Sequence, residues 1–435
     1  GLVSIVTLVA FESLAVVTIL PDVEADLGGL SWYGWVTTAF FLGTMIGIVF
    51  AGRQADRHGL ARPYVAGLAL FAVGLLVGGL APSMPMLVVA RVVQGFGAGV
   101  VPAVGYVAIG RFYREALRPR MFAVLSTAWV VPGIVGPALS ERIAHLTSWR
   151  WVFLGLLPLV IVAGSLIVPT MRRIGAPDAA GVPDADADTP WLRRPMVEAV
   201  RVAAGAALII GGLTRGDWAL APMAVAGLVV GLQPLRRLTP PGTLRAAPGL
   251  PAVVLSRGMV MFAFYGADAF VPYALTHAKL TSTFAGSVAV TASTLGWTAA
   301  VWVQQRHIVR LGEAYFIRVG YAVVAAGLGT MALTAAVDDV PFWVIHIGAV
   351  VAGAGVGLAY SAHTQATLRV ADPERYGAAT ASLQLCDNLG VALGAGLSGA
   401  VIAFGDGRGW APGSGVGVAF VAPVVVALVG AGLVA

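Results

Sequence analysis

Two acidic residues lie inside long apolar segments of this sequence, at matching places. Glu12 lies nine residues before Pro21, where its segment ends, and Asp268 follows 256 residues later, again about nine residues before the end of its segment. In a membrane-spanning helix, which rises about 1.5 Å per residue, each carboxyl group would lie about 13 Å from the outer end, near the midplane. A charge there costs about 3 kcal/mol, and burial favours the neutral acid. The two residues indicate groups that exchange protons or contact a substrate; hydrogen-bonded packing residues are the alternative.

Long apolar helices must position these residues. Of the 435 residues, 58% are hydrophobic and only 11% are charged, whereas about 25% are charged in water-soluble domains. Apolar segments of about 17–25 residues, each enough to span a bilayer, fall at 1–20, 31–52, 63–81, 86–110, 121–144, 151–170, 196–213, 218–235, 250–276, 281–303, 315–336, 341–366, 378–404 and 414–435. The predicted fold class is an all-α integral membrane protein with fourteen transmembrane helices.

The basic residues predict the orientation of these helices. Nineteen arginines lie in the loops on one side, and the loops on the other side carry only Arg142, Arg150, Arg215, Lys279 and Arg408. Cytoplasmic loops carry the excess of basic residues, so both termini are predicted to be cytoplasmic and the helix number to be even. The net charge of +6 is spread over these loops, which argues against a nucleic-acid partner.

A motif that occurs twice, about 255 residues apart, predicts an internal duplication. Gly95 and Gly99 recur as Gly353 and Gly357, and small residues at this spacing let helices pack closely. Two six-helix bundles separated by two inserted helices account for the offset, and duplicated bundles are typical of secondary transporters. The predicted divisions are an N-terminal bundle at 1–170, a cytoplasmic linker at 171–195, two inserted transmembrane helices at 196–236, a second linker at 237–249 and a C-terminal bundle at 250–435.

Other polar residues within the helices have more than one interpretation. Pro272 has no N–H for the carbonyl of Asp268, so we expect a kinked or broken helix beside that acid. Arg257 is expected to anchor the cytoplasmic end of the same helix. Glu198 and Arg201, three residues apart, are expected to pair with each other or to meet lipid headgroups.

A short basic segment joins the second and third predicted helices. It contains Gly52, Asp56, Arg57, Gly59 and Arg62. A carboxylate in this position can pair with neighbouring arginines and helix N-termini and so act as a conformational latch. The alternative is that these charges only set the topology.

These motifs resemble those of the major facilitator superfamily. The signature loop of that family has the pattern of Gly52 to Arg62, and Arg91, Gln94, Gly95 and Gly99 resemble its motif on the fourth helix. Gly133, Gly136 and Pro137 resemble its antiporter motif, although Ser140 and Glu141 replace the two trailing glycines. The sequence Trp149-Arg150-Trp151-Val152-Phe153 and the helix number are similar to the branch of fourteen-helix drug:proton antiporters.

The resemblance implies a proton-coupled exporter of small hydrophobic or amphipathic compounds in a bacterial plasma membrane. It suggests that Arg91 lies near a proton path with Glu12 and Asp268, and Asp387 is a third acidic candidate. A lipid or envelope-glycolipid exporter of the same fold, a transport-inactive scaffold or sensor, and an importer are the alternatives. We expect a monomer that uses the proton gradient and no cofactor.

The sequence offers no pattern for enzymatic or metal chemistry. Cys386 is the only cysteine, and His346 and His363 are seventeen residues apart and interpreted as structural. No glycine-rich phosphate loop supports an ATP-driven pump. Residue 1 falls within an apolar run, so we expect that N-terminal residues are missing.

Overall fold

A computed structural model of the protein describes residues 2–112, 128, 130–173, 194–215, 220–371 and 376–433. The first half contains α1 (Leu2–Leu27), α2 (Tyr33–His58), α3 (Ala61–Gly79), α4 (Met84–Phe112), α6 (Val130–Leu146), α7 (Arg150–Leu154) and α8 (Leu156–Arg173). Then come α9 (Pro195–Arg215) and α10 (Leu220–Leu238). The second half contains α11 (Leu250–Asp268), α12 (Val271–Tyr273), the π-helix η5 (Ala274–Ala278), α13 (Thr283–Leu311), α14 (Glu313–Ala336), α15 (Trp343–Val370), α16 (Tyr376–Asp406) and α17 (Pro412–Leu433).

Twelve of the described helices are long and apolar enough to cross a membrane. The other two predicted spans correspond to α6, which has 17 described residues, and to α10, which ends with Arg236 and Arg237. The protein is therefore an all-helical, multi-pass membrane protein. The number fourteen and the predicted domain boundaries stay predictions, since the first part of segment 121–144 and most of linker 171–195 lie outside the described residues.

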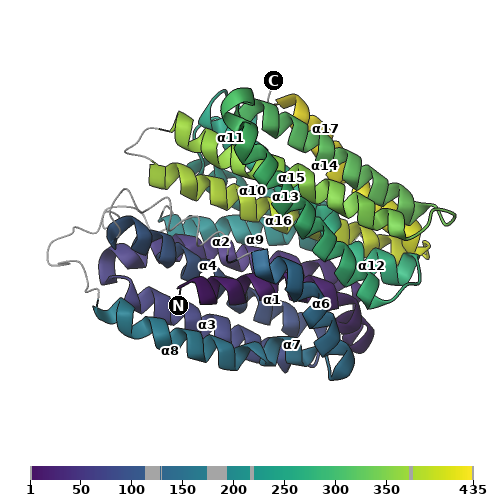
Figure 1. Ribbon diagram of the computed structural model, residues 1–435, viewed down its shortest axis with the longest axis horizontal. Helices are drawn as coiled ribbons and strands as arrows, with labels where there is room; N and C mark the ends of the chain where they lie inside the picture. Colours follow the sequence, from purple (N-terminus) through teal and green to yellow (C-terminus); the bar gives the residue numbers. More distant parts are fainter. Residues whose placement is uncertain are drawn as a thin grey trace.

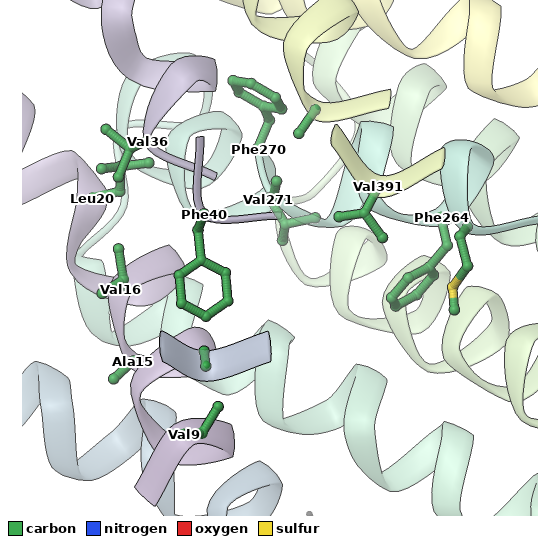
Figure 2. Packing of buried hydrophobic residues seen from close by; sticks show 14 of the residues in the cluster. Val9, Ala15, Val16, Leu20, Val36, Phe40, Phe264, Phe270, Val271 and Val391 are labelled. Carbon is green, nitrogen blue, oxygen red and sulfur yellow. The ribbon is translucent and has the colours of Figure 1, made fainter. Parts of the chain in front are cut away.

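The two halves lie one above the other in Figure 1, with the first half in purple and blue and the second in green and yellow. Their contact is made largely by α2 with α16 and by α6 with α13. Thr38 donates a hydrogen bond to the carbonyl oxygen of Ala392 at 2.9 Å, and Gly34 lies close to the backbone of Ala395 and Gly399. Figure 2 shows apolar residues of both halves, such as Phe40 and Phe264, within one buried cluster. We call the end of the bundle where α1 ends and α2 begins the predicted external end.

The repeated glycines make equivalent contacts in the two halves. A Cβ on Gly95 would collide with the carbonyl oxygen of Phe40 on α2, and one on Gly353 would collide with that of Ser293 on α13. Gly99 and Gly357 face carbonyl oxygens in the same manner. The interpretation of these glycines as packing positions agrees with this geometry, because only a hydrogen atom fits between the helices.

Two helix ends differ from the sequence prediction. The first helix was predicted to end near Pro21, but α1 continues through this proline to Leu27. One missing N–H is tolerated in such a helix when neighbouring helices surround it. The helix that contains Asp268 is interrupted, since α11 ends at this residue and the chain resumes as α12 and η5. Glu12 lies 15 residues before the end of α1, whereas Asp268 is the last residue of α11. The two acids therefore do not lie at the equal distances from their helix ends that the sequence predicted.

The inserted helix α9 lies where the two halves meet. Trp35 of α2 donates a hydrogen bond from Nε1 to Thr214 Oγ1 at 3.3 Å, and Ile210 packs against Gly396 of α16. The next helix, α10, packs closely on α9 where Gly205 meets Gly227. The hairpin of α9 and α10 therefore covers one side of the seam between α2 and α16.

Candidate functional site

A buried ion pair joins α1 and α4 in the first half. Glu12 is fully buried, and its Oε1 accepts a hydrogen bond from Nη1 of Arg91, which is 2% exposed. The same guanidinium donates to Gln94 Oε1 at 2.8 Å and to the Val36 carbonyl oxygen at 3.2 Å. It also lies 4.1 Å from the centre of the Phe40 ring. The arginine predicted to lie near a proton path is therefore held directly against the candidate acid.

Two polar atoms of this cluster have no hydrogen-bond partner within the described residues. They are Oε2 of Glu12 and Nε2 of Gln94. Buried polar atoms are almost always hydrogen-bonded, and an unpartnered one costs free energy. The cluster thus holds both a carboxylate oxygen that can accept a proton and an amide that can donate a hydrogen bond.

Asp268 has a different environment from Glu12, although the sequence placed them at equivalent positions. It is 7% exposed, and the side chain of Ser293 on α13 lies near its carboxyl group. No ion pair between described residues includes it. Because it ends α11, its carboxyl group also lies at the negative end of that helix dipole. The second half therefore does not reproduce the carboxylate–guanidinium pair at this position.

Arg257 forms the ion pair of the second half, so the prediction that it anchors a helix end is wrong. Its Nε and Nη2 each lie 3.3 Å from an oxygen of Asp387 on α16, and Nη1 donates to the Tyr360 carbonyl oxygen at 2.7 Å. Its guanidinium lies 3.0 Å from the centre of the Tyr360 ring. Arg257 is 2% exposed because these partners replace water. The sequence did contain a signal for this ion pair, because Arg257 lies inside an apolar segment, eleven residues before Asp268.

A chain of aromatic rings connects the two ion pairs across the halves. Successive ring centres lie 5.1–5.8 Å apart along Phe40, Phe41, Tyr265, Phe264, Trp297 and Tyr360. We call these six residues the aromatic array. Its Phe41–Tyr265 contact joins α2 to α11. Sequence reasoning missed the array because helical spacing alone does not tell which aromatic residues face the partner bundle.

The candidate antiporter motif lies on α6, which packs between the halves. Gly133 faces the methyl group of Thr294 on α13, and Gly136 lies beside the Phe11 ring of α1. The Pro137 carbonyl oxygen accepts a hydrogen bond from Ser140. These small positions allow α6 to contact both halves closely.

The candidate latch segment is more helical than predicted. Helix α2 continues from Gly52 to His58, and the turn is confined to Gly59, at φ 73°, and Leu60. Arg62 is exposed in the first turn of α3. The side chains of Asp56 and Arg57 lie outside the described residues, so the latch stays a prediction.

Two other expected contacts have structural outcomes. Glu198 pairs with Arg237 of α10 at 2.9 Å and not with Arg201. This ion pair joins the two inserted helices. His363 contacts Ser256 Oγ at 2.8 Å and the Ala359 carbonyl oxygen at 2.7 Å. This buried histidine therefore links α11 and α15, in agreement with a structural role.

The fold and the family match are those of a membrane transporter and not of an enzyme. The chain belongs to the Major Facilitator Superfamily, whose family model matches residues 2–255.

Comparison with known proteins places several transporters among its relatives. The probable multidrug-efflux transporter Rv1634 of Mycobacterium tuberculosis is 29% identical over 430 residues, which cover 95% of this chain and 89% of that protein. The multidrug transporter protein MdtP of Bacillus subtilis is 31% identical over 163 residues, 38% of this chain and 30% of that protein. The fold is similar to that of the xylose transporter XylE from E. coli in a partially occluded inward open conformation, with a TM-score of 0.64, 15% identity and coverage of 98% and 95%.

Proposed function

We propose that the protein exports small hydrophobic or amphipathic compounds, in the manner of multidrug transporters, in exchange for protons. The observation that carries this proposal is the buried pair of Glu12 and Arg91, in which Glu12 Oε2 has no partner within the described residues. A proton on Glu12 would neutralise the acid and leave the guanidinium without its counter-ion. Because breaking a buried ion pair costs about 3–5 kcal/mol, protonation would favour a conformation in which Arg91 has other partners.

The proton gradient would supply part of this energy. One charge that crosses a potential of 100 mV releases about 2.3 kcal/mol, less than the cost of breaking the pair, and new partners for Arg91 would supply the rest. In this proposal the two halves alternate in opening to each side of a bacterial plasma membrane, with both termini in the cytoplasm. The transporter acts as a single chain without a cofactor.

The aromatic array is proposed to contact the exported compound. Four of its members, Phe41, Tyr265, Trp297 and Tyr360, are partly exposed within the bundle, and they come from both halves. Ring faces bind apolar and planar groups without a fixed hydrogen-bond pattern, and they attract cations. The multidrug names of the relatives support this assignment. The carboxylate of Asp387, 16% exposed beside Tyr360, would be available to a cationic group.

The proposal is tested by transport in vesicles with an imposed pH gradient and a panel of neutral and cationic aromatic compounds. Glu12→Gln should abolish gradient-driven accumulation, because the amide cannot exchange a proton. Binding of the compounds should remain. Asp268→Asn should abolish or weaken coupling if this second acid also carries a proton.

The matched control is Glu198→Gln, which removes an acid that is paired on the inserted helices. It should leave transport unchanged. The double variant Glu12→Gln/Arg91→Gln has no unpaired buried charge and tests coupling if Glu12→Gln folds poorly. Native accumulation in all the Glu12 and Asp268 variants would contradict the proposal.

A lipid exporter of the same fold is less well supported. Such a protein would need a lateral path into the bilayer, and α9 covers one side of the seam between α2 and α16. A scaffold or sensor would gain nothing from a buried Glu12–Arg91 pair. Accumulation of lipid instead of the aromatic compounds would favour the first alternative.

A further inference from the structure

A histidine and a glutamate connect the two halves at the predicted external end. Nε2 of His277 on η5 lies 3.5 Å from Oε2 of Glu24 near the end of α1. Among the ion pairs formed between described residues, this pair alone has its partners in different halves. The side chains are 34% and 18% exposed, so water and protons reach them.

The local backbone fixes which imidazole nitrogen faces Glu24. Thr276 donates its hydroxyl proton to backbone carbonyl oxygens, at 3.0 Å for Pro272 and 3.3 Å for Tyr273. When the Thr276 hydroxyl donates to these carbonyl oxygens, its oxygen, 2.9 Å from His277 Nδ1, accepts a hydrogen bond from that nitrogen. With Nδ1 as the donor, a neutral imidazole turns the lone pair of Nε2 toward the carboxylate. Protonation at Nε2 converts this repulsive contact into an ion pair.

The neighbouring residues do not provide another counter-ion for Glu24 within the described part of the chain. The ring of Tyr273 stacks on His277 at 4.2 Å, and Tyr273 in turn contacts Tyr33 of α2 at 5.4 Å. Lys279 is the nearest basic residue in sequence, and its ammonium group donates to the carbonyl oxygens of Val337, Asp338 and Val340.

The charged groups around this contact are of both signs. Acids of both halves lie nearby, namely Asp22 on α1, Asp406 at the end of α16, and Asp338 and Asp339 after α14, while α17, which also packs on η5, has no titratable residue. The basic groups that α6 and α7 bring to the end of α1 face other acids, since His145 lies near Asp22, which is also near Glu141, and Arg150 pairs with Asp26 at 2.6 Å. Glu24 is thus the acid that faces His277 directly.

We infer that Glu24 and His277 form a proton-operated latch that holds the two halves together at the predicted external end. A histidine changes its charge between about pH 5 and 8, so the latch closes as the solution on that side becomes acidic. The contacts of Tyr33 with Tyr273 and Phe270, 5.4 and 5.3 Å between ring centres, lie beside it and would open with it. The latch concerns conformation and does not require proton-coupled export.

The test measures the separation of the halves in the full chain, reconstituted in lipid nanodiscs without substrate. Spin labels are placed at two exposed positions of the predicted external end by Leu80→Cys and Asp339→Cys, on a Cys386→Ser background. Acidification from about pH 8 to pH 5.5 should raise the ratio of short to long distances about two- to fivefold, as expected for a partly exposed pair.

His277→Gln and Glu24→Gln should each abolish the increase on acidification and keep the ratio of short to long distances at its alkaline value. His277→Arg carries a permanent charge and should keep the ratio at its acidic value at both pH values. The control is His307→Gln, an exposed histidine near the far end of α13, which should respond as the native chain does.

The native response in both His277→Gln and Glu24→Gln would overturn the latch, as would a His277→Arg variant that still responds to pH. If either His277→Gln or Glu24→Gln fails to give a monodisperse preparation, the other variant tests the latch alone, because each removes one partner of the same contact. Loss of drug transport in the Glu12 variants would not alter these outcomes, so the two proposals fail separately.

Discussion

The two halves share their close-packed glycines but distribute their charges differently. In the first half an acid on α1 pairs with an arginine on α4, whereas in the second half an arginine on α11 pairs with an acid on α16. Asp268 on α11, the sequence counterpart of Glu12, has a serine beside it. The two halves therefore share the backbone contacts between helices, which tolerate no added atom, but differ in the polar residues that they bury.

The largest expected difference between the halves concerns their arginines. Arg91→Gln leaves a fully buried Glu12 without its counter-ion, so we expect a loss of about 3–5 kcal/mol in unfolding free energy. Arg257→Gln should cost less, because Asp387 is 16% exposed and water can solvate it. Unfolding of the purified variants in detergent measures both values. Adding Glu12→Gln to Arg91→Gln should restore most of the stability, and equal losses for the two arginines would contradict the comparison.

The second prediction tests the feature that the halves share. Gly95→Ala and Gly353→Ala each push a methyl group against a carbonyl oxygen of the neighbouring helix, so both should lose about 1–3 kcal/mol by overpacking. Gly329→Ala is the matched control, since a Cβ at this helical position meets nothing within 4 Å. The three variants are compared in the same unfolding assay. A large loss in only one half would show that the repeated packing is not equivalent.

The smallest expected effect distinguishes the two acids that the sequence places at equivalent positions. Asp268→Asn removes no counter-ion from a described basic residue, so its unfolding free energy should stay within about 1 kcal/mol of the native value. Glu12→Gln should be clearly less stable, because Arg91 loses its counter-ion. A destabilised Asp268→Asn chain would indicate that this acid supports the packing of α11 and α13.

Sequence reasoning predicted the features that depend on local composition. Apolar length and the paired glycines were sufficient for a duplicated, all-helical membrane protein, and the cost of a buried acid was sufficient to select Glu12. Whether Glu12 carries a proton stays a prediction. The helix through Pro21 was mispredicted because the neighbouring helices, which the sequence does not reveal, stabilise it.

Contacts between distant residues could not be predicted in the same way. Arg257 and Asp387 are 130 residues apart, and their contact depends on the rotation of two helices about their axes. The aromatic array has the same origin, since it draws on α2, α11, α13 and α15. A single sequence with regular apolar spacing leaves these rotations undetermined.

The position of α9 across the seam has a mechanical consequence. Any displacement of one half against the other must shear the contacts of α9 with either α2 or α16, because it touches both. Those contacts include one hydrogen bond, from Trp35 to Thr214, and the packing of Ile210 on Gly396. Val202, Ala203 and Ala206 of α9 also pack in one apolar cluster with residues of α2 and α16, among them Met45 and Leu389. An interface of mostly apolar contacts has few directional bonds to break when helices slide, and it keeps lipid chains away from the seam. The inserted hairpin would thus guide the two halves as they slide past each other.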